Sequence, residues 1–178
     1  EFTIESVKNR NDIHLYIKAH PAEIHGSSET QFTITEKLLL KYPLLPNNVT
    51  IIPPDLGIMP YSLFKYIDVG IVLSGTLGLE MALNKIPVIA TGFAPYLRKG
   101  FVHEPKDHKE YKNMLLMKNN SLSIDKNKLE LFAYFYFIKT LIPFNLVEKC
   151  LGITVENLNY KIDSITDLEP EKDIYLDH

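Results

Sequence analysis

The sequence has few of the features that cross-link a chain or attach it to a membrane. Cys150 is the only cysteine among 178 residues, which excludes a disulfide within the chain and a cysteine-based metal site. A single cysteine also favours a reducing compartment. The formal net charge is −3, so no basic excess points to nucleic acid as a partner. No apolar run is long enough to span a membrane. We therefore expect a cytoplasmic protein, with the inner face of the membrane as an alternative location.

What the sequence does contain is a strand–helix–strand pattern between residues 68 and 92. Val69–Leu73 and Pro87–Ala90 are short apolar runs rich in β-branched residues, as is typical of parallel strands covered on both faces. Between them, apolar residues recur at the i, i+3, i+4, i+7 spacing of one helix face. These residues are Leu79, Ala82, Leu83 and Ile86. The pattern predicts a βαβ unit and hence an α/β fold.

The turn before this helix carries Ser74, Gly75 and Thr76. The N-terminus of a helix presents backbone N–H groups without partners, and the Ser74 and Thr76 hydroxyls add further donors. Gly75 and Gly78 have no side chains that would keep a ligand away from the backbone. The turn therefore suits a phosphate. Glu80 lies one turn later and leans back toward Thr76, where it could accept hydrogen bonds from two ribose hydroxyls. The structural alternative is that the hydroxyls cap the helix and that Glu80 is a first-turn acid. The sequence alone leaves both interpretations open.

A second candidate group follows an earlier predicted strand, His14–Ala19. Pro21 stops that strand and holds His20 in an extended conformation. Lys18 and His20 share one strand parity, so both side chains point the same way at the carboxyl end, where open α/β sheets bind ligands. There they could hold a phosphate or protonate a leaving oxygen. The structural alternative is a capped loop histidine beside a solvated lysine.

A metal site is a less favoured interpretation of the same stretch. His20, Glu23 and His25 fit neither the helical nor the strand spacing of metal ligands, and no further ligand is evident. We expect no metal.

The loop after the second strand of the βαβ unit contains an aromatic residue, two cations and a glycine. They are Tyr96, Arg98, Lys99 and Gly100. This loop could close over a diphosphate or a sugar acid, and an ordinary basic surface loop is the alternative.

Further elements are predicted around the central unit. A strand is expected at Val49–Ile52, a helix entered at residues 28–30 and ended by Pro43, and another helix at Asp107–Met117. Tyr61 and Ser62 precede the βαβ unit on the side where a base or ribose could lie. Plain loop packing is the alternative for these two residues.

A helix is also predicted at Leu129–Leu141. It is apolar nearly all round, with five aromatic residues between Phe132 and Phe137. It is too short to span a bilayer. We expect it to be buried on more than one side, packing across a domain junction. A peripheral membrane or capsule-assembly contact is the alternative.

Four segments, taken in order, resemble the motifs of the capsule polysaccharide biosynthesis proteins. They read IKAHPAE, PYSLFKYID, SGTLGLEMALNKIPVIATG and YLRKGF. Members of that family are GT-B-type glycosyltransferases, some of which transfer Kdo from its CMP-activated form. The resemblance covers roughly residues 14–140, and the later DLEPEKDIYLD is similar to the family's downstream segment.

The resemblance implies a site for a nucleotide-sugar donor, with no cofactor. Glu80 would bind the donor ribose. His20 would be catalytic, stabilising the departing nucleotide phosphate with the support of Lys18. The other implied donor-binding residues belong to the turn and to the later loop: Ser74, Gly75, Thr76 and Gly78, then Tyr96, Arg98, Lys99 and Gly100.

The resemblance also implies the domain organisation. Residues 1–145 would form a Rossmann-like parallel sheet flanked by helices, the donor-binding lobe of an inverting GT-B enzyme of surface polysaccharide assembly, and residues 146–178 a C-terminal extension. We expect the acceptor, a glycan or a lipid-linked glycan, to bind a further lobe, without which the chain would be inactive. A CDP-glycerol glycerophosphotransferase, a sugar-nucleotide 2-epimerase and a non-catalytic nucleotide-sensing or scaffold module remain alternatives.

Overall fold

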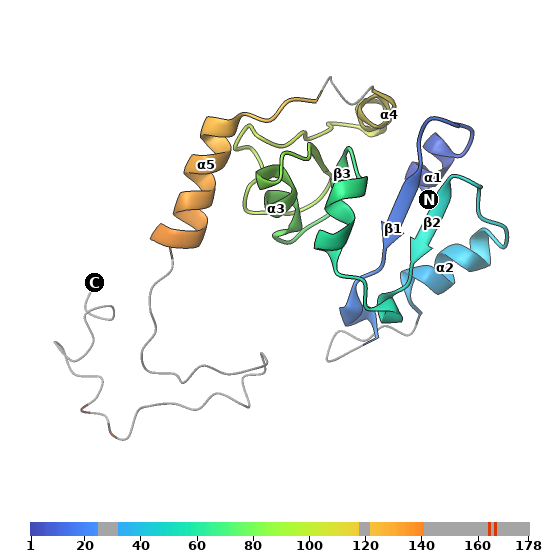
Figure 1. Ribbon diagram of the computed structural model, residues 1–178, viewed down its shortest axis with the longest axis horizontal. Coiled ribbons are helices and arrows are strands. Elements are labelled where there is room, and N and C mark those ends of the chain that lie inside the picture. Colours follow the sequence, from blue (N-terminus) through green and yellow to red (C-terminus); the bar gives the residue numbers. More distant parts are fainter. Residues whose placement is uncertain (25–31, 118–121, 141–163, 165, 167–178) are drawn as a thin grey trace. The chain divides into compact units, whose positions relative to one another are not determined.

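The computed structural model describes residues 1–24, 32–117 and 122–140, together with residues 164 and 166. The chain divides into two units, residues 1–130 and residues 131–178. Figure 1 traces the first unit as two small parallel sheets with helices around them. The α/β class predicted from the sequence is confirmed.

The described elements include short 3₁₀ helices, labelled η1, η3 and η4, and one π-helical turn, labelled η6. In chain order they are α1 (Phe2–Val7), β1 (Leu15–Lys18), η1 (Pro21–Glu23), α2 (Ile34–Lys41), β2 (Val49–Ile52), η3 (Pro54–Leu56), η4 (Pro60–Tyr66), β3 (Gly70–Val72), α3 (Leu77–Leu83), β4 (Val88–Ala90), α4 (His108–Leu116), α5 (Lys126–Tyr134) and η6 (Phe135–Lys139).

The strands pair in parallel, as their apolar runs predict. In one sheet Leu15 of β1 lies opposite Val49 of β2, and in the other Gly70 of β3 lies opposite Val88 of β4. Among the described residues β1 and β3 do not pair, so the parallel sheet predicted as one unit is present as two halves. Apolar runs indicate where strands form, but the choice of neighbour depends on contacts between segments far apart in the sequence.

Helix ends follow local capping signals. Thr33 and Glu36 form a reciprocal capping box at the start of α2, and Tyr42 ends the helix just before Pro43. The helix entry predicted at residues 28–30 lies outside the described residues, and the described helix begins only at Ile34 because the capping box fixes its start there. The helix predicted at Asp107–Met117 is confirmed as α4, with Asp107 as its N-cap.

The face of α3 that packs on its sheet differs from the predicted one by one residue. Leu79 and Ala82 are buried as expected, and so is Ile86, which follows the end of the helix, but Leu83 is 42% exposed and Met81 is buried in its place. Met81 packs where Gly70 lacks a side chain: a Cβ at Gly70 would lie 2.5 Å from the Met81 sulfur. The glycine in β3 therefore decides which side of α3 lies on the sheet.

The helix predicted at Leu129–Leu141 is found as α5 and η6, and residue 141 lies outside the described part. Leu129 is buried, but many of the large apolar side chains that follow it are exposed. The prediction that this helix is buried on more than one side is therefore wrong for the exposed residues. No helix in the described ranges is long and apolar enough to cross a bilayer.

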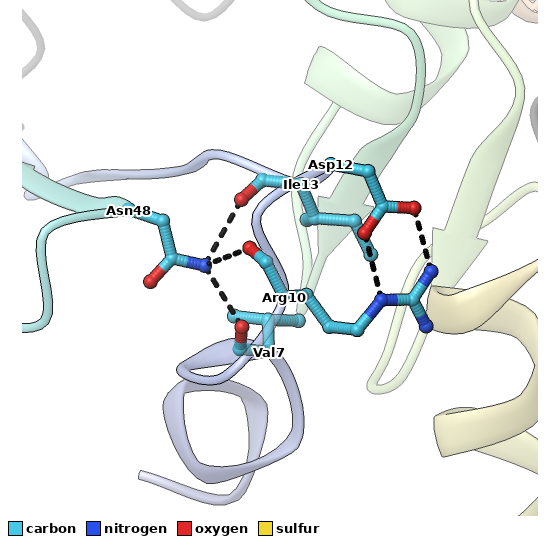
Figure 2. A network of polar contacts seen from close by, with 5 residues as sticks. All are labelled: Val7, Arg10, Asp12, Ile13 and Asn48. Atoms are coloured by element: carbon cyan, nitrogen blue, oxygen red, sulfur yellow. Dashed lines mark hydrogen bonds and ion pairs between the residues drawn. The ribbon is translucent and has the colours of Figure 1, made fainter.

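A single side-chain amide holds the N-terminal elements together (Figure 2). The Nδ2 group of Asn48, just before β2, donates to the carbonyl oxygens of Val7, Arg10 and Ile13 at 2.8, 2.9 and 2.9 Å. These carbonyls lie at the end of α1 and in the loop that enters β1. The Arg10 guanidinium donates two hydrogen bonds of 2.7 Å to Asp12 within that loop. Asn48 therefore ties α1 and β1 to the start of β2.

We expect Asn48→Asp to lower the free energy of unfolding by about 2–4 kcal/mol, because a carboxylate of the same shape cannot donate to the three carbonyls. Asn47→Asp is the matched control: its exposed side chain should tolerate the same change within about 0.5 kcal/mol. Urea denaturation of both variants measures the difference. Equal midpoints would show that the Asn48 contacts contribute nothing to stability.

Candidate functional site

The turn between β3 and α3 is open to solvent. Ser74, Gly75 and Thr76 are all exposed. Gly75 has φ +82°, a left-handed conformation in which other residues are strained. No side chain caps α3. The structural alternative, in which the Ser74 and Thr76 hydroxyls cap this helix, is therefore not observed. Since α3 has only seven residues, its macrodipole is small, and the turn mainly offers hydroxyl and backbone N–H donors.

The Glu80 carboxylate is held over this turn by two hydroxyl groups. Thr76 Oγ1 donates to Glu80 Oε1 at 2.6 Å, which is the backward lean that the spacing of these residues predicts. The Tyr61 phenol, from η4, forms a side-chain hydrogen bond with the same carboxylate. That hydrogen bond raises the pKa of Tyr61 above its ordinary value. Glu80 is thus oriented from two elements, α3 and η4.

A hollow of about 560 Å³ lies beside this cluster. It is lined by Tyr61, Ser62, Phe64, Lys65, Asn84 and Ile86. The Tyr61 and Phe64 rings meet edge to face, with centroids 5.6 Å apart. Because Tyr61 both contacts Glu80 and lines the hollow, an acidic hydrogen-bond acceptor and an aromatic surface are adjacent. The sequence analysis placed Tyr61 and Ser62 near the site but missed Phe64, which no spacing rule links to Glu80.

His20 acts as a cap in this structure. Its Nδ1 accepts a hydrogen bond of 3.1 Å from the Ala22 N–H at the start of η1. Accepting at Nδ1 places the proton of the neutral ring on Nε2, which can then donate to a ligand. Glu23 completes the capping box and also accepts a 2.7 Å hydrogen bond from the Ile34 N–H. The structural role is therefore present, and it leaves the second ring nitrogen for another function.

Lys18 lies at the end of β1, and its Nζ donates to the Ala19 carbonyl at 3.4 Å. The side chain is half-buried and lines a cavity of about 700 Å³ that is bounded by β1 on one side and by β3 and η4 on another. Within the described residues, no hydrogen bond or ion pair joins Lys18 or His20 to the turn at residues 74–80. The two predicted parts of the site are thus both present but not in direct contact.

Tyr96 is a core residue. Its side chain is 0% exposed, and its ring packs near Phe101 with centroids 6.2 Å apart. A Cβ at Gly78 would lie 2.9 Å from the Tyr96 ring and 3.0 Å from the Val72 side chain. The space left by the missing side chain at Gly78 is therefore filled by Tyr96. Packing of the loop against α3 is the observed role of this pair.

The rest of that loop faces solvent. Arg98 and Lys99 are exposed, and the Arg98 backbone N–H donates to Glu104 at 2.6 Å. Arg98 and Gly100 have φ +59° and +82°. The loop therefore presents two cations from a tightly turned backbone, next to the helix that Tyr96 anchors.

In the part of the chain that the structure describes, no three histidine, cysteine, aspartate or glutamate side chains lie so that they could hold a metal ion together. His25, which the sequence analysis considered as a metal ligand together with His20 and Glu23, lies outside that part.

We expect Gly78→Ala to destabilise the protein by about 1–3 kcal/mol through overpacking against Tyr96. Tyr96→Phe removes the hydroxyl nearest the new methyl group and should recover part of that loss. The double variant should then be more stable than the sum of the single changes implies. Urea unfolding of the four proteins tests this, and strict additivity would rule out the contact.

Comparison with protein-family models, with curated proteins and with solved structures found no match.

Proposed function

We propose that this chain is the donor-binding lobe of an inverting GT-B-type glycosyltransferase of capsule or surface polysaccharide assembly, with a CMP-activated sugar such as CMP-Kdo as donor. The sequence motifs carry the resemblance. The parallel strands and the βαβ unit are compatible with a Rossmann-like lobe, of which the two half-sheets would be parts. Ligands of such folds bind beyond the carboxyl ends of parallel strands, where the turn at residues 74–76 follows β3.

The observation that carries the proposal is the position of Glu80. Its carboxylate is oriented by Thr76 and Tyr61, and Tyr61 continues into the aromatic-lined hollow beside it. A carboxylate is the natural acceptor for the two hydroxyls of a ribose, and an aromatic surface suits the attached base. Tyr61 contacts the Glu80 carboxylate and also lines the hollow. A nucleoside could therefore place its ribose against Glu80 and its base in the hollow.

The donor phosphate would lie on the turn of Ser74 and Thr76. Loss of the nucleotide leaves negative charge on this phosphate, so donors and cations around it would stabilise the transition state. His20 can donate from Nε2, Lys18 supplies a positive charge, and the exposed cations of the 96–100 loop could close over the sugar or diphosphate. The acceptor and the catalytic base would come from another lobe, so the chain alone should bind donor without transferring sugar.

Titration calorimetry with CMP, CDP, UMP and UDP, without added metal, tests the nucleotide site. Glu80→Gln should weaken nucleotide binding by about 1–3 kcal/mol, because the neutral amide is a weaker acceptor for hydroxyls and brings N–H donors of its own. Glu130→Gln is the control, since this exposed glutamate forms only a surface ion pair with Lys126 among the described contacts. Equal affinity of wild type and Glu80→Gln would remove Glu80 from the site.

The preference of the site for a cytidine or a uridine nucleotide distinguishes the alternative enzyme classes. Selective binding of a cytidine nucleotide supports the proposal and also admits a CDP-glycerol glycerophosphotransferase, whereas preference for UDP would favour a hexosyltransferase or a 2-epimerase. Binding without any activity in the full-length enzyme would favour the nucleotide-sensing module.

His20→Asn separates the two roles of His20. Asparagine is a good N-cap, so the fold should keep its stability while the Nε2 donor is lost. We expect nucleotide affinity to fall by about 1–2 kcal/mol, measured by the same calorimetry, with thermal unfolding as the check on stability. Unchanged affinity would reduce His20 to its capping role.

A further inference from the structure

The segment formed by α5 and η6 has an exposed stripe of large apolar side chains. Leu131, Tyr134, Phe135 and Ile138 follow one another at the i, i+3, i+4, i+7 spacing, so they share one side of the segment. Their exposed fractions are 59%, 48%, 51% and 62%. A contiguous exposed apolar stripe marks an interaction surface.

Cations flank this stripe. Lys126 and Lys128 lie in the first turn of α5, and Lys139 ends η6 with its Nζ 5.9 Å from the centroid of the Tyr134 ring. Residues 125–140 also contain two acidic residues, Asp125 and Glu130, which form surface ion pairs with Lys128 and Lys126. The segment is therefore locally positive within a chain whose formal net charge is −3. This charge complements an anionic surface.

The composition disfavours a second helix as the partner. Helix pairs use a narrow seam of mainly aliphatic residues with polar side chains elsewhere. Here aromatic residues continue around the segment at Phe132, Tyr136 and Phe137, and Phe137 is 37% exposed. Tyrosine and phenylalanine beside lysine are characteristic of helices that lie at a lipid interface, where the rings enter the acyl boundary and the lysines reach the headgroups.

We propose that residues 126–139 form a monotopic anchor that lies in the plane of an anionic lipid surface, with Leu131, Tyr134, Phe135 and Ile138 inserted below the headgroups. Lys139 would bind the lipid phosphates at one end, and at the other end Lys126 and Lys128 would do so by exchanging their surface ion pairs with Glu130 and Asp125. A helix that lies in the plane of the lipid interface binds reversibly. The proposal does not depend on the nucleotide site.

The sequence contains no tryptophan, so a single introduced one reports on its own surroundings. In the full chain, Phe135→Trp should show a blue-shifted emission on addition of vesicles made of equal parts phosphatidylglycerol and phosphatidylcholine, and quenching by brominated acyl chains. Leu44→Trp, at a site 91% exposed in the first unit, should show neither change. Absence of both changes in Phe135→Trp, or their presence in both variants, would overturn the proposal.

Vesicle co-sedimentation measures the affinity. Phe135→Glu combined with Ile138→Glu should weaken partitioning at least roughly tenfold, whereas Leu40→Glu, at an exposed leucine of α2, should not change it. Each Lys→Gln change at Lys126 and Lys128 should cost roughly fivefold on anionic vesicles, and pure phosphatidylcholine should bind weakly. A concentration-dependent dimer that Phe135→Glu disrupts, without any vesicle binding, would identify a second copy as the partner and refute the anchor.

Discussion

Close packing at Gly78 positions the candidate site. Because this residue of α3 has no side chain, the Tyr96 ring fits between the helix and the loop after β4, and the first turn of α3 approaches Val72 of β3. The fully buried Tyr96 then links the βαβ unit to the loop that carries the exposed cations. The turn at residues 74–76 is left at the surface above this packed layer. A buried aromatic residue thus holds in place a site that it does not line.

The polar groups of the site are already oriented by the protein. Glu80 receives hydrogen bonds from Thr76 and Tyr61, and His20 is fixed by the Ala22 N–H. Each carboxylate oxygen can accept two hydrogen bonds, so Glu80 retains capacity for ligand hydroxyls. A ligand that binds such groups loses less free energy to ordering side chains. Orientation of this kind favours a binding role for Glu80, and the His20 contact also caps η1.

Local patterns in the sequence determined much of the secondary structure. The apolar runs that form β2, β3 and β4 are recognisable by their β-branched residues. Helix α4 begins directly after Asp107, an acidic N-cap residue that can be identified in the sequence. Capping signals act over three or four residues, which is why they can be identified from the sequence. The backward lean of Glu80 toward Thr76 was predictable for the same reason, since both lie on adjacent turns of one helix.

What only the tertiary structure decided are the contacts between distant segments. Tyr61 reaches Glu80, Tyr96 fills the space at Gly78, and Asn48 binds three carbonyls at the start of the chain, yet no periodicity connects these partners. The pairing of the strands into two half-sheets and the exposure of the aromatic helix depend on the same kind of contact. An apolar run specifies that a surface must be covered, but its covering partner is set by the packing of the whole chain.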